Sequence, residues 1–180
     1  MWRKYEMEYL FETEHLKFRR FEMSDAHKLF ENHLEPEMKQ WIPNESYEDI
    51  SETVGAINFY MDCINNRQLP YVLAIELKEN GELIGDTGVN EVEGDNNAVE
   101  IGYSICNQYS GKGYATEAVI AMTNYVEHTF GIKTLYGRVM KGNIASVKVM
   151  EKSGYIYFKE EFGAEDDPYG KGMLIFKKEI

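Results

Sequence analysis

The sequence predicts an α/β protein built on a single mixed sheet with helices on both faces. Short runs alternate apolar and polar residues, as half-buried strands do, whereas longer runs carry apolar residues at helical spacing. These segments follow one another as strand, two helices, three strands, helix, strand, helix and two strands, an order that favours one layered sheet. The chain has 180 residues. It is therefore expected to form one domain, 1–180, that buries about 70% of its unfolded surface.

The strand signals define the sheet. Alternation begins at Leu16 to Arg20, and Asn80-Gly81 separates two apolar runs as a tight hairpin would. Residues 1–13 are interpreted as either an extra strand or an arm. The expected strands are 16–20, 71–77, 82–92, 98–105, 134–140, 155–162 and 169–178.

Four helices are expected because polar caps precede apolar stripes and glycines follow two of them. Ser24, Ser46 and Asn143 are the expected N-caps of three helices, and the fourth follows a glycine-rich loop. Gly131 and Gly154 are the expected ends of the last two helices. The two early helices are expected to reach about residues 34 and 64.

The stretch from Gln108 to Ala118 carries the most information about function. Gly111 and Gly113 follow a strand-like run and precede a long amphipathic pattern. Glycines there allow a left-handed backbone and the close approach of a ligand. The helix behind them directs free N–H groups and the positive end of its dipole toward one point. The pattern therefore predicts a site for a phosphate or pyrophosphate.

Two other phosphate-binding motifs fit this stretch less well. A P-loop requires G-x-x-x-x-G-K-[ST], but Cys106 stands at the first glycine and Gly113 follows Lys112. A dinucleotide fingerprint requires G-x-G-x-x-G, but Thr116 occupies the third glycine position. Taken alone, this stretch has one further interpretation: the glycines begin a helix and bind no ligand.

A second segment, Asn143 to Tyr155, narrows the choice. It reads N-x-x-S-x-x-V-x-E-K-x-G-Y, and residues 100–103 just before the loop read E-I-G-Y. Together with Q-x-x-G-x-G-x-A from Gln108, these motifs resemble those of the GNAT superfamily of N-acetyltransferases. The likeness is greatest to the branch that contains the ribosomal-protein alanine N-acetyltransferases. The three motifs cover roughly residues 99–155.

The resemblance implies a mostly antiparallel sheet of the acyl-CoA N-acyltransferase fold. It also implies transfer of an acetyl group from acetyl-CoA to a primary amine, on a protein N-terminus, a polyamine or another small amine. The loop amides should hold the pyrophosphate, and Tyr103 to Ile105 should pair with the pantetheine arm. The cofactor-binding residues implied are Tyr103, Ser104, Ile105, Gln108, Gly111, Lys112, Gly113, Tyr114, Ala115, Thr116 and Asn143. The alternative function is a catalytically silent acyl-CoA-binding or regulatory module on the same fold.

Glu100 and Ser146 are the candidate catalytic residues. Glu100 is expected to take the proton of the amine, directly or through water, although a glutamate pKa of about 4.3 is low for this task without burial. The other interpretation of Glu100 is a surface or structural glutamate. Many family members carry a tyrosine where this chain has Met150, so Ser146 is the expected donor to the leaving thiolate. The other interpretation of Ser146 is that it caps the helix N-terminus and packs as a small residue.

No covalent intermediate is expected. Neither Cys63 nor Cys106 has a histidine nearby in the sequence that could act as its base, so the acetyl group should pass directly to the amine. The acceptor site is expected to be formed by residues 40–45, the helix after them and the strand at 86–93. The motifs do not specify which amine binds there.

The composition narrows the partners. A net charge of −12 argues against nucleic-acid binding, which needs surplus lysine and arginine. No run of 18 apolar residues predicts a membrane span. The first residues lack the apolar centre of a signal peptide, and with only two cysteines the chain is predicted to be cytoplasmic. The four histidines show no metal-ligand spacing, so no metal is expected. The protein is expected to be a monomer or a homodimer.

Overall fold

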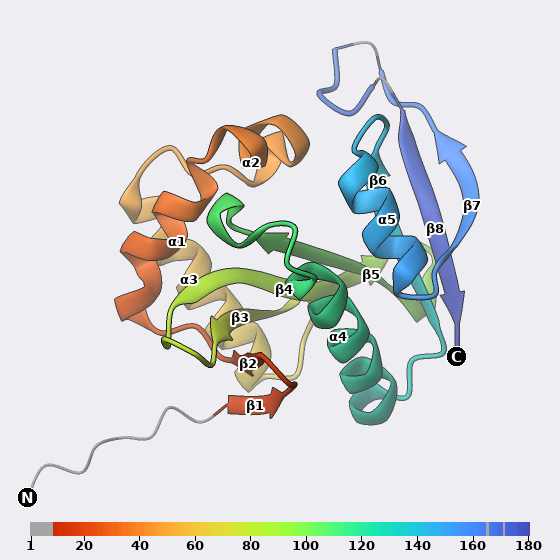
Figure 1. The fold of residues 1–180 in the computed structure, drawn as a ribbon. Coiled ribbons are helices and arrows are strands. Elements are labelled where there is room, and N and C mark those ends of the chain that lie inside the picture. The colour runs from red at the N-terminus through yellow and green to blue at the C-terminus, as the bar shows by residue number, and fades with distance from the viewer. Residues whose placement is uncertain (1–8, 165, 171) are drawn as a thin grey trace, which may run out of the picture.

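The computed structural model describes residues 9–164, 166–170 and 172–180 and contains one eight-stranded sheet (Figure 1). The strands are β1 (Tyr9–Glu12), β2 (Leu16–Arg19), β3 (Tyr71–Leu77), β4 (Leu83–Val92), β5 (Asp95–Ile105), β6 (Thr134–Met140), β7 (Ile156–Glu161) and β8 (Met173–Glu179). The helices are α1 (Ala26–His33), α2 (Pro36–Trp41), α3 (Ile50–Asn65), α4 (Tyr114–Phe130) and α5 (Ile144–Lys152).

The strands lie in the order β1-β2-β3-β4-β5-β6-β8-β7. Neighbouring strands are antiparallel except for β5 and β6, which run parallel because α4 carries the chain from one to the other. The expected mixed, mostly antiparallel sheet is confirmed.

Helices cover both faces of the sheet. In Figure 1, α4 and α5 lie on the near side of the sheet and α3 lies on the far side. The larger apolar core forms beneath α4, where Val119 and Met122 are fully buried together with side chains of the central strands. A smaller core joins Leu29 of α1 and Ile57 of α3 to the other face.

Two predicted caps in the first half of the chain were wrong. Ser24 lies inside a short 3₁₀ turn, because Glu22 occupies the N-cap and its N–H donates to the buried carboxylate of Asp25. The cap of α3 is Asp49, which accepts the N–H groups of Ser51 and Glu52 at 2.8 and 3.0 Å. Ser46 instead follows another 3₁₀ turn, which delays the start of the helix.

The sequence also missed α2 and misplaced two strand starts. Pro36 begins α2, since a proline is well tolerated in the first turn, where its missing N–H has no helical partner. Strand β5 begins at Asp95 rather than at residue 98, and β8 begins at Met173 rather than at residue 169. Part of the predicted N-terminal strand or arm is observed as β1, and residues 1–8 lie outside the described part of the chain.

Candidate active site

One large cleft, of about 1000 Å³, brings most of the predicted site residues together. It lies at the sheet between the ends of β5 and β6 and the N-termini of α4 and α5. The predicted residues that line it are Glu100, Tyr103, Ser104, Ile105, Gly111, Gly113, Tyr114, Ala115, Thr116, Asn143 and Ser146. Gln108 and Lys112 do not line it: both are exposed, and the Lys112 ammonium lies 5.0 Å from the centre of the Tyr109 ring.

The cleft exists because β5 and β6 separate. Their residues pair from Ala98 and Thr134 as far as Ile101 and Gly137, although β5 continues to Ile105 and β6 to Met140. Residues 102–105 of β5 keep their partners on β4, so their other edge faces the cleft. A strand edge with free N–H and C=O groups can pair with an extended amide-bearing ligand.

The glycine loop ends at the N-terminus of α4. Gly111 and Gly113 have φ angles of 72° and 88°, in the left-handed region that glycine adopts without strain. No heavy atom lies within 4 Å of a Cβ built on either residue, so open space borders the loop. Gly113 is the N-cap and has no side chain to satisfy the first-turn N–H groups. These amides are therefore available to a phosphate ligand.

Glu100 lies on β5 at the point where the strands part. Its carboxylate is partly covered, with 32% of the side chain exposed, and lies 3.9 Å from the guanidinium of Arg138. Burial raises the pKa of Glu100, Arg138 opposes this shift, and the nearby carboxylate of Glu161 adds to it. A raised pKa makes the carboxylate a better proton acceptor than an exposed glutamate.

Ser146 lies across the cleft in the first turn of α5. Its N–H donates to the side-chain oxygen of Asn143 at 3.1 Å, so Asn143 caps the helix. The hydroxyl of Ser146 lies 2.7 Å from the phenol oxygen of Tyr103 on β5. The resemblance implies that Tyr103 pairs with the pantetheine arm, and it gives no role to the side chain. Strand alternation indicates where that side chain lies, because Tyr103 shares a face of β5 with buried Ile101, toward α5.

Met150, at the family's usual tyrosine position, belongs to the core. Its side chain is 1% exposed, and its sulfur fills the space above Gly137 where a larger residue would place its Cβ. Cys106 is also buried, and burial raises the pKa of its thiol to about 11. Such a thiol is a poor nucleophile at neutral pH.

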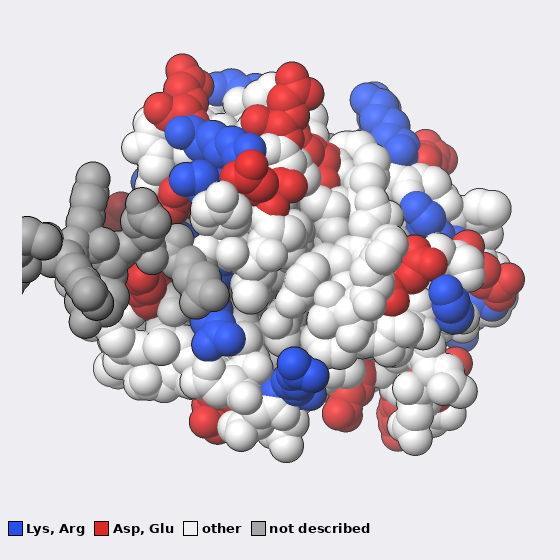
Figure 2. Space-filling view, turned by 90° about the horizontal axis from the view of Figure 1, so that it is seen from below, with Lys and Arg blue, Asp and Glu red and all other residues white. Residues whose placement is uncertain are grey.

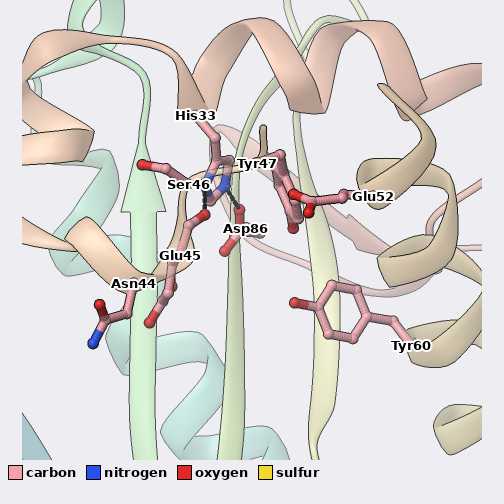
Figure 3. Close-up of a pocket in the computed structure, with 8 residues that line it drawn as sticks. All are labelled: His33, Asn44, Glu45, Ser46, Tyr47, Glu52, Tyr60 and Asp86. Carbon is pink, nitrogen blue, oxygen red and sulfur yellow. Dashed lines mark hydrogen bonds and ion pairs between the residues drawn. The ribbon is translucent and has the colours of Figure 1, made fainter. Parts of the chain in front are cut away.

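A side pocket of about 300 Å³ adjoins the cleft and shares Glu45, Tyr60 and Asp86 with it. Figure 3 shows His33 between the Glu45 backbone and the Asp86 side chain. The ring donates from Nδ1 to the Glu45 carbonyl at 2.7 Å, and Nε2 lies 3.1 Å from the Asp86 carboxylate. Burial acts to lower the pKa of His33, but the hydrogen bond and charge of Asp86 outweigh it and raise the pKa.

The side pocket is acidic. Glu45, Glu52 and Asp86 line it together with His33, and none of the lining residues is a lysine or arginine. In Figure 3 the Glu45 carboxylate points away from His33. That carboxylate remains open to the cavity, yet the protein around it and the charges of Asp86 and Glu100 raise its pKa. The charges of Asp86 and Glu100 therefore act on Glu45 at the junction of pocket and cleft.

The charges of the cleft are divided between its two sides. Its acidic residues lie on the side of α2, β4 and β5, whereas its basic residues lie on β6 and α5. The acidic set is Glu35, Glu37, Glu45, Asp86 and Glu100, and the basic set is Arg138, Lys148 and Lys152. Figure 2 shows a face on which both signs surround an uncharged middle, so on that face the net charge does not form a single acidic field.

In the described ranges, no three histidine, cysteine or carboxylate side chains come together as a metal site. None of the described helices has the length and hydropathy needed to cross a bilayer.

Comparison with known proteins identifies the family. The model of the acetyltransferase (GNAT) domain matches residues 15–156. The uncharacterized N-acetyltransferase p20 of Bacillus licheniformis is 30% identical over 163 residues, covering 91% of this chain and 89% of the relative. The chain therefore belongs to the GNAT acetyltransferases, and it is an acetyl-CoA-dependent acyltransferase.

Solved structures share the fold at lower identity. A ribosomal-protein-S5-alanine acetyltransferase from Vibrio fischeri has a TM-score of 0.79 at 17% identity, with 94% of this chain and 95% of that chain covered. MccE, a Microcin C7 self-immunity acetyltransferase in complex with acetyl-CoA and AMP, has a TM-score of 0.76 at 19% identity, with 93% and 94% covered. The resemblance to the branch of ribosomal-protein alanine acetyltransferases is thus confirmed at the level of fold.

Proposed function

We propose that this protein transfers an acetyl group directly from acetyl-CoA to a cationic primary amine. The observation that carries the proposal is the parting of β5 and β6 next to the open N-terminus of α4. It provides a strand edge for the pantetheine amides and helical N–H groups for the pyrophosphate within one cleft. MccE, which has the same fold, was solved with acetyl-CoA.

The acetyl donor is proposed to occupy the cleft from the glycine loop to the parted strands. The free amides around Gly113 hold the phosphates, and Lys148 and Lys152 add positive charge on the neighbouring helix. Residues 102–105 offer their unpaired edge to the pantetheine arm. This placement brings the thioester between Glu100 and Ser146, which line the cleft from different elements.

The acceptor is proposed to approach from the acidic side. Amines are ammonium ions at neutral pH, and the carboxylates of Glu45, Asp86 and Glu100 favour a cation there. Glu100 then takes a proton from the ammonium, directly or through water. The freed nitrogen attacks the thioester carbon, and no enzyme nucleophile is needed because the buried thiol of Cys106 stays protonated.

Two glycine variants test cofactor binding. Gly113→Val should weaken acetyl-CoA binding at least about tenfold, because the side chain would crowd the loop amides. Gly94→Val is the matched control: Gly94 has a similar φ of 81°, also has open space around its Cβ position, and lies in the turn between β4 and β5. Calorimetry with acetyl-CoA measures both. Equal affinity in the two variants would remove the loop from the proposed site.

Catalysis is tested separately. Wild-type protein is mixed with acetyl-CoA and a pool of amines that contains peptides with free N-termini, polyamines and aminoglycosides, and thiol release is followed. Amine-dependent release supports the transferase. Acetyl-CoA binding without release from any pool would instead support the silent acyl-CoA-binding module, for which the buried Met150 at the usual tyrosine position is the favouring observation.

A further inference from the structure

The hydroxyl groups of Tyr103 and Ser146 form a hydrogen-bonded pair inside the cleft. The two oxygens are 2.7 Å apart, and both residues line the cavity. Tyr103 comes from β5 and Ser146 from α5, so the pair links the strand to the helix beside the gap between β5 and β6. If the phenol donates, the proton of Ser146 remains free to face the cleft.

Met150 cannot supply a proton. The hydroxyl groups of Tyr103 and Ser146 are therefore the candidate proton donors at the α5 side of the cleft. A serine alcohol alone is a weak acid, and giving up its proton would leave an alkoxide. When the phenol of Tyr103 donates its proton to the serine oxygen, the negative charge ends on the phenol oxygen. A phenolate is far more stable than a serine alkoxide.

We propose that Tyr103 supplies, through Ser146, the proton that neutralises the departing CoA thiolate. As the carbon–sulfur bond breaks, its electron pair stays on sulfur. The sulfur takes the proton of the Ser146 hydroxyl while Ser146 takes the proton of the phenol. The resulting phenolate of Tyr103 regains a proton from water, which balances the proton that the amine loses to Glu100 and then to solvent. Tyr103 acts through Ser146 and is therefore a positioning and proton-supplying residue.

The acidities in the cleft fit this direction of transfer. Burial raises the pKa of Tyr103 to about 12, while the bond to Ser146 lowers it somewhat, so the phenol is protonated at neutral pH. A thiol in water has a pKa of about 8.5. Burial raises the pKa of the Cys106 thiol, which does not line the cleft, to about 11. A thiolate that departs beside the partly buried hydroxyl pair likewise loses part of its water, which brings its proton affinity closer to that of the phenol.

The chain contains a matched control. Tyr155 also donates to or accepts from a hydroxyl at 2.7 Å, that of Thr123, and burial raises its pKa to about 12 as well. Neither Tyr155 nor Thr123 lines the cleft. Tyr155→Phe therefore removes an equivalent buried phenol without touching the proposed proton path.

The first measurement needs no known acceptor. CoA and desulfo-CoA, which lacks the thiol, are titrated into each variant by calorimetry across neutral to alkaline pH. Because burial raises the pKa of the bound thiol, CoA should lose affinity relative to desulfo-CoA as pH rises through the range in which the free thiol ionises. In wild type the hydrogen bond from the pair limits this loss. Tyr103→Phe should deepen the loss about tenfold, the effect of raising the pKa of the bound thiol by about one further unit. Ser146→Ala should deepen it at least as much, and Tyr155→Phe should keep the wild-type loss.

The second measurement is turnover with an amine found in the thiol-release assay. Tyr103→Phe should lower kcat about ten- to a hundredfold, at the lower end of general-acid effects because Ser146 remains, with an unchanged KM for acetyl-CoA. A Tyr103→Phe protein with wild-type thiol ionisation and wild-type kcat would overturn the proposal. Equal losses in Tyr155→Phe would overturn it too, because they would mark a packing effect.

The inference rests on the proposed function, but the two fail differently. If wild-type protein binds no CoA, the proposed function fails and this inference fails with it. If wild type binds CoA and acetylates amines while Tyr103→Phe matches it in both measurements, only the role of Tyr103 is lost.

Discussion

Replacing Glu100 by glutamine tests the proposed base most directly. Glu100→Gln keeps the shape of the side chain and removes its capacity to accept a proton. Arg138, whose guanidinium lies 3.9 Å from Glu100, keeps a closer partner in Glu161 at 2.9 Å. The variant therefore leaves no unpaired charge, and since these side chains are about one-third exposed, its effect on stability should stay below about 1 kcal/mol.

The expected loss is about 100-fold in kcat/KM, the low end of general-base catalysis by a single side chain. This corresponds to about 2.7 kcal/mol of transition-state free energy, at about 1.36 kcal/mol for each factor of ten. A larger loss is not expected, because the cleft is open enough for water to take the proton in place of Glu100.

The assay is a pH–rate profile with a saturating acetyl donor. Since burial raises the pKa of Glu100, wild-type kcat/KM should fall on the acidic side as this carboxylate is protonated above its usual range. Glu100→Gln should lack that limb. Its deficit should shrink as pH rises, because solvent then supplies more of the amine in its neutral form.

Glu161→Gln is the matched control. It removes the other carboxylate beside Arg138 but does not line the cleft. Its charge helps to raise the pKa of Glu100, so its loss should move the acid limb to lower pH while the plateau rate is kept. Wild-type rates in Glu100→Gln at every pH, or equal losses in both variants, would refute the assignment of Glu100 as base.

Two further predictions concern groups outside the proton path. His33→Gln should lower stability more at acidic than at alkaline pH: the raised pKa of His33 means that its pairing contributes fully below about pH 6.5 and is lost as pH rises through the folded-state pKa. Urea unfolding of wild type and His33→Gln across this pH range measures the difference in their free energies of unfolding. A difference that does not change with pH would contradict the prediction. Cys106→Ala should keep turnover, and mass spectrometry after incubation with acetyl-CoA alone should find no acetylated cysteine. Kinetically competent acetylation of Cys106 would overturn direct transfer.

The sequence predicted the features that depend on local chemistry. The glycines at 111 and 113 have the positive φ angles that the pattern indicated, and Asn143 caps its helix. In these cases a motif specifies backbone conformation within a few residues, and tertiary contacts do not override it.

Features that depend on distant partners escaped prediction. His33 meets Asp86, and Tyr103 meets Ser146, across separations of 53 and 43 residues. Strand alternation indicates the face of β5 on which Tyr103 lies, but no periodicity in a single sequence specifies the partner of either side chain. The wrong cap at Ser46 has a related cause, because Pro43 starts a 3₁₀ turn that shifts the helix start to a second acceptor, Asp49.

The short pairing of β5 with β6 also makes the acetyl donor a mechanical part of the protein. Within the described residues, strand pairing joins the β1–β5 side of the sheet to the β6–β8 side only at the four positions from Ala98 to Ile101, whereas β4 and β5 stay paired as far as Ile105. On the proposed function, bound acetyl-CoA replaces the missing hydrogen bonds and holds the two sides together. At about 100 times its dissociation constant it would add about 2.7 kcal/mol to the free energy of unfolding. Product CoA would bridge the same gap, so each turnover must end with the sheet losing that connection again.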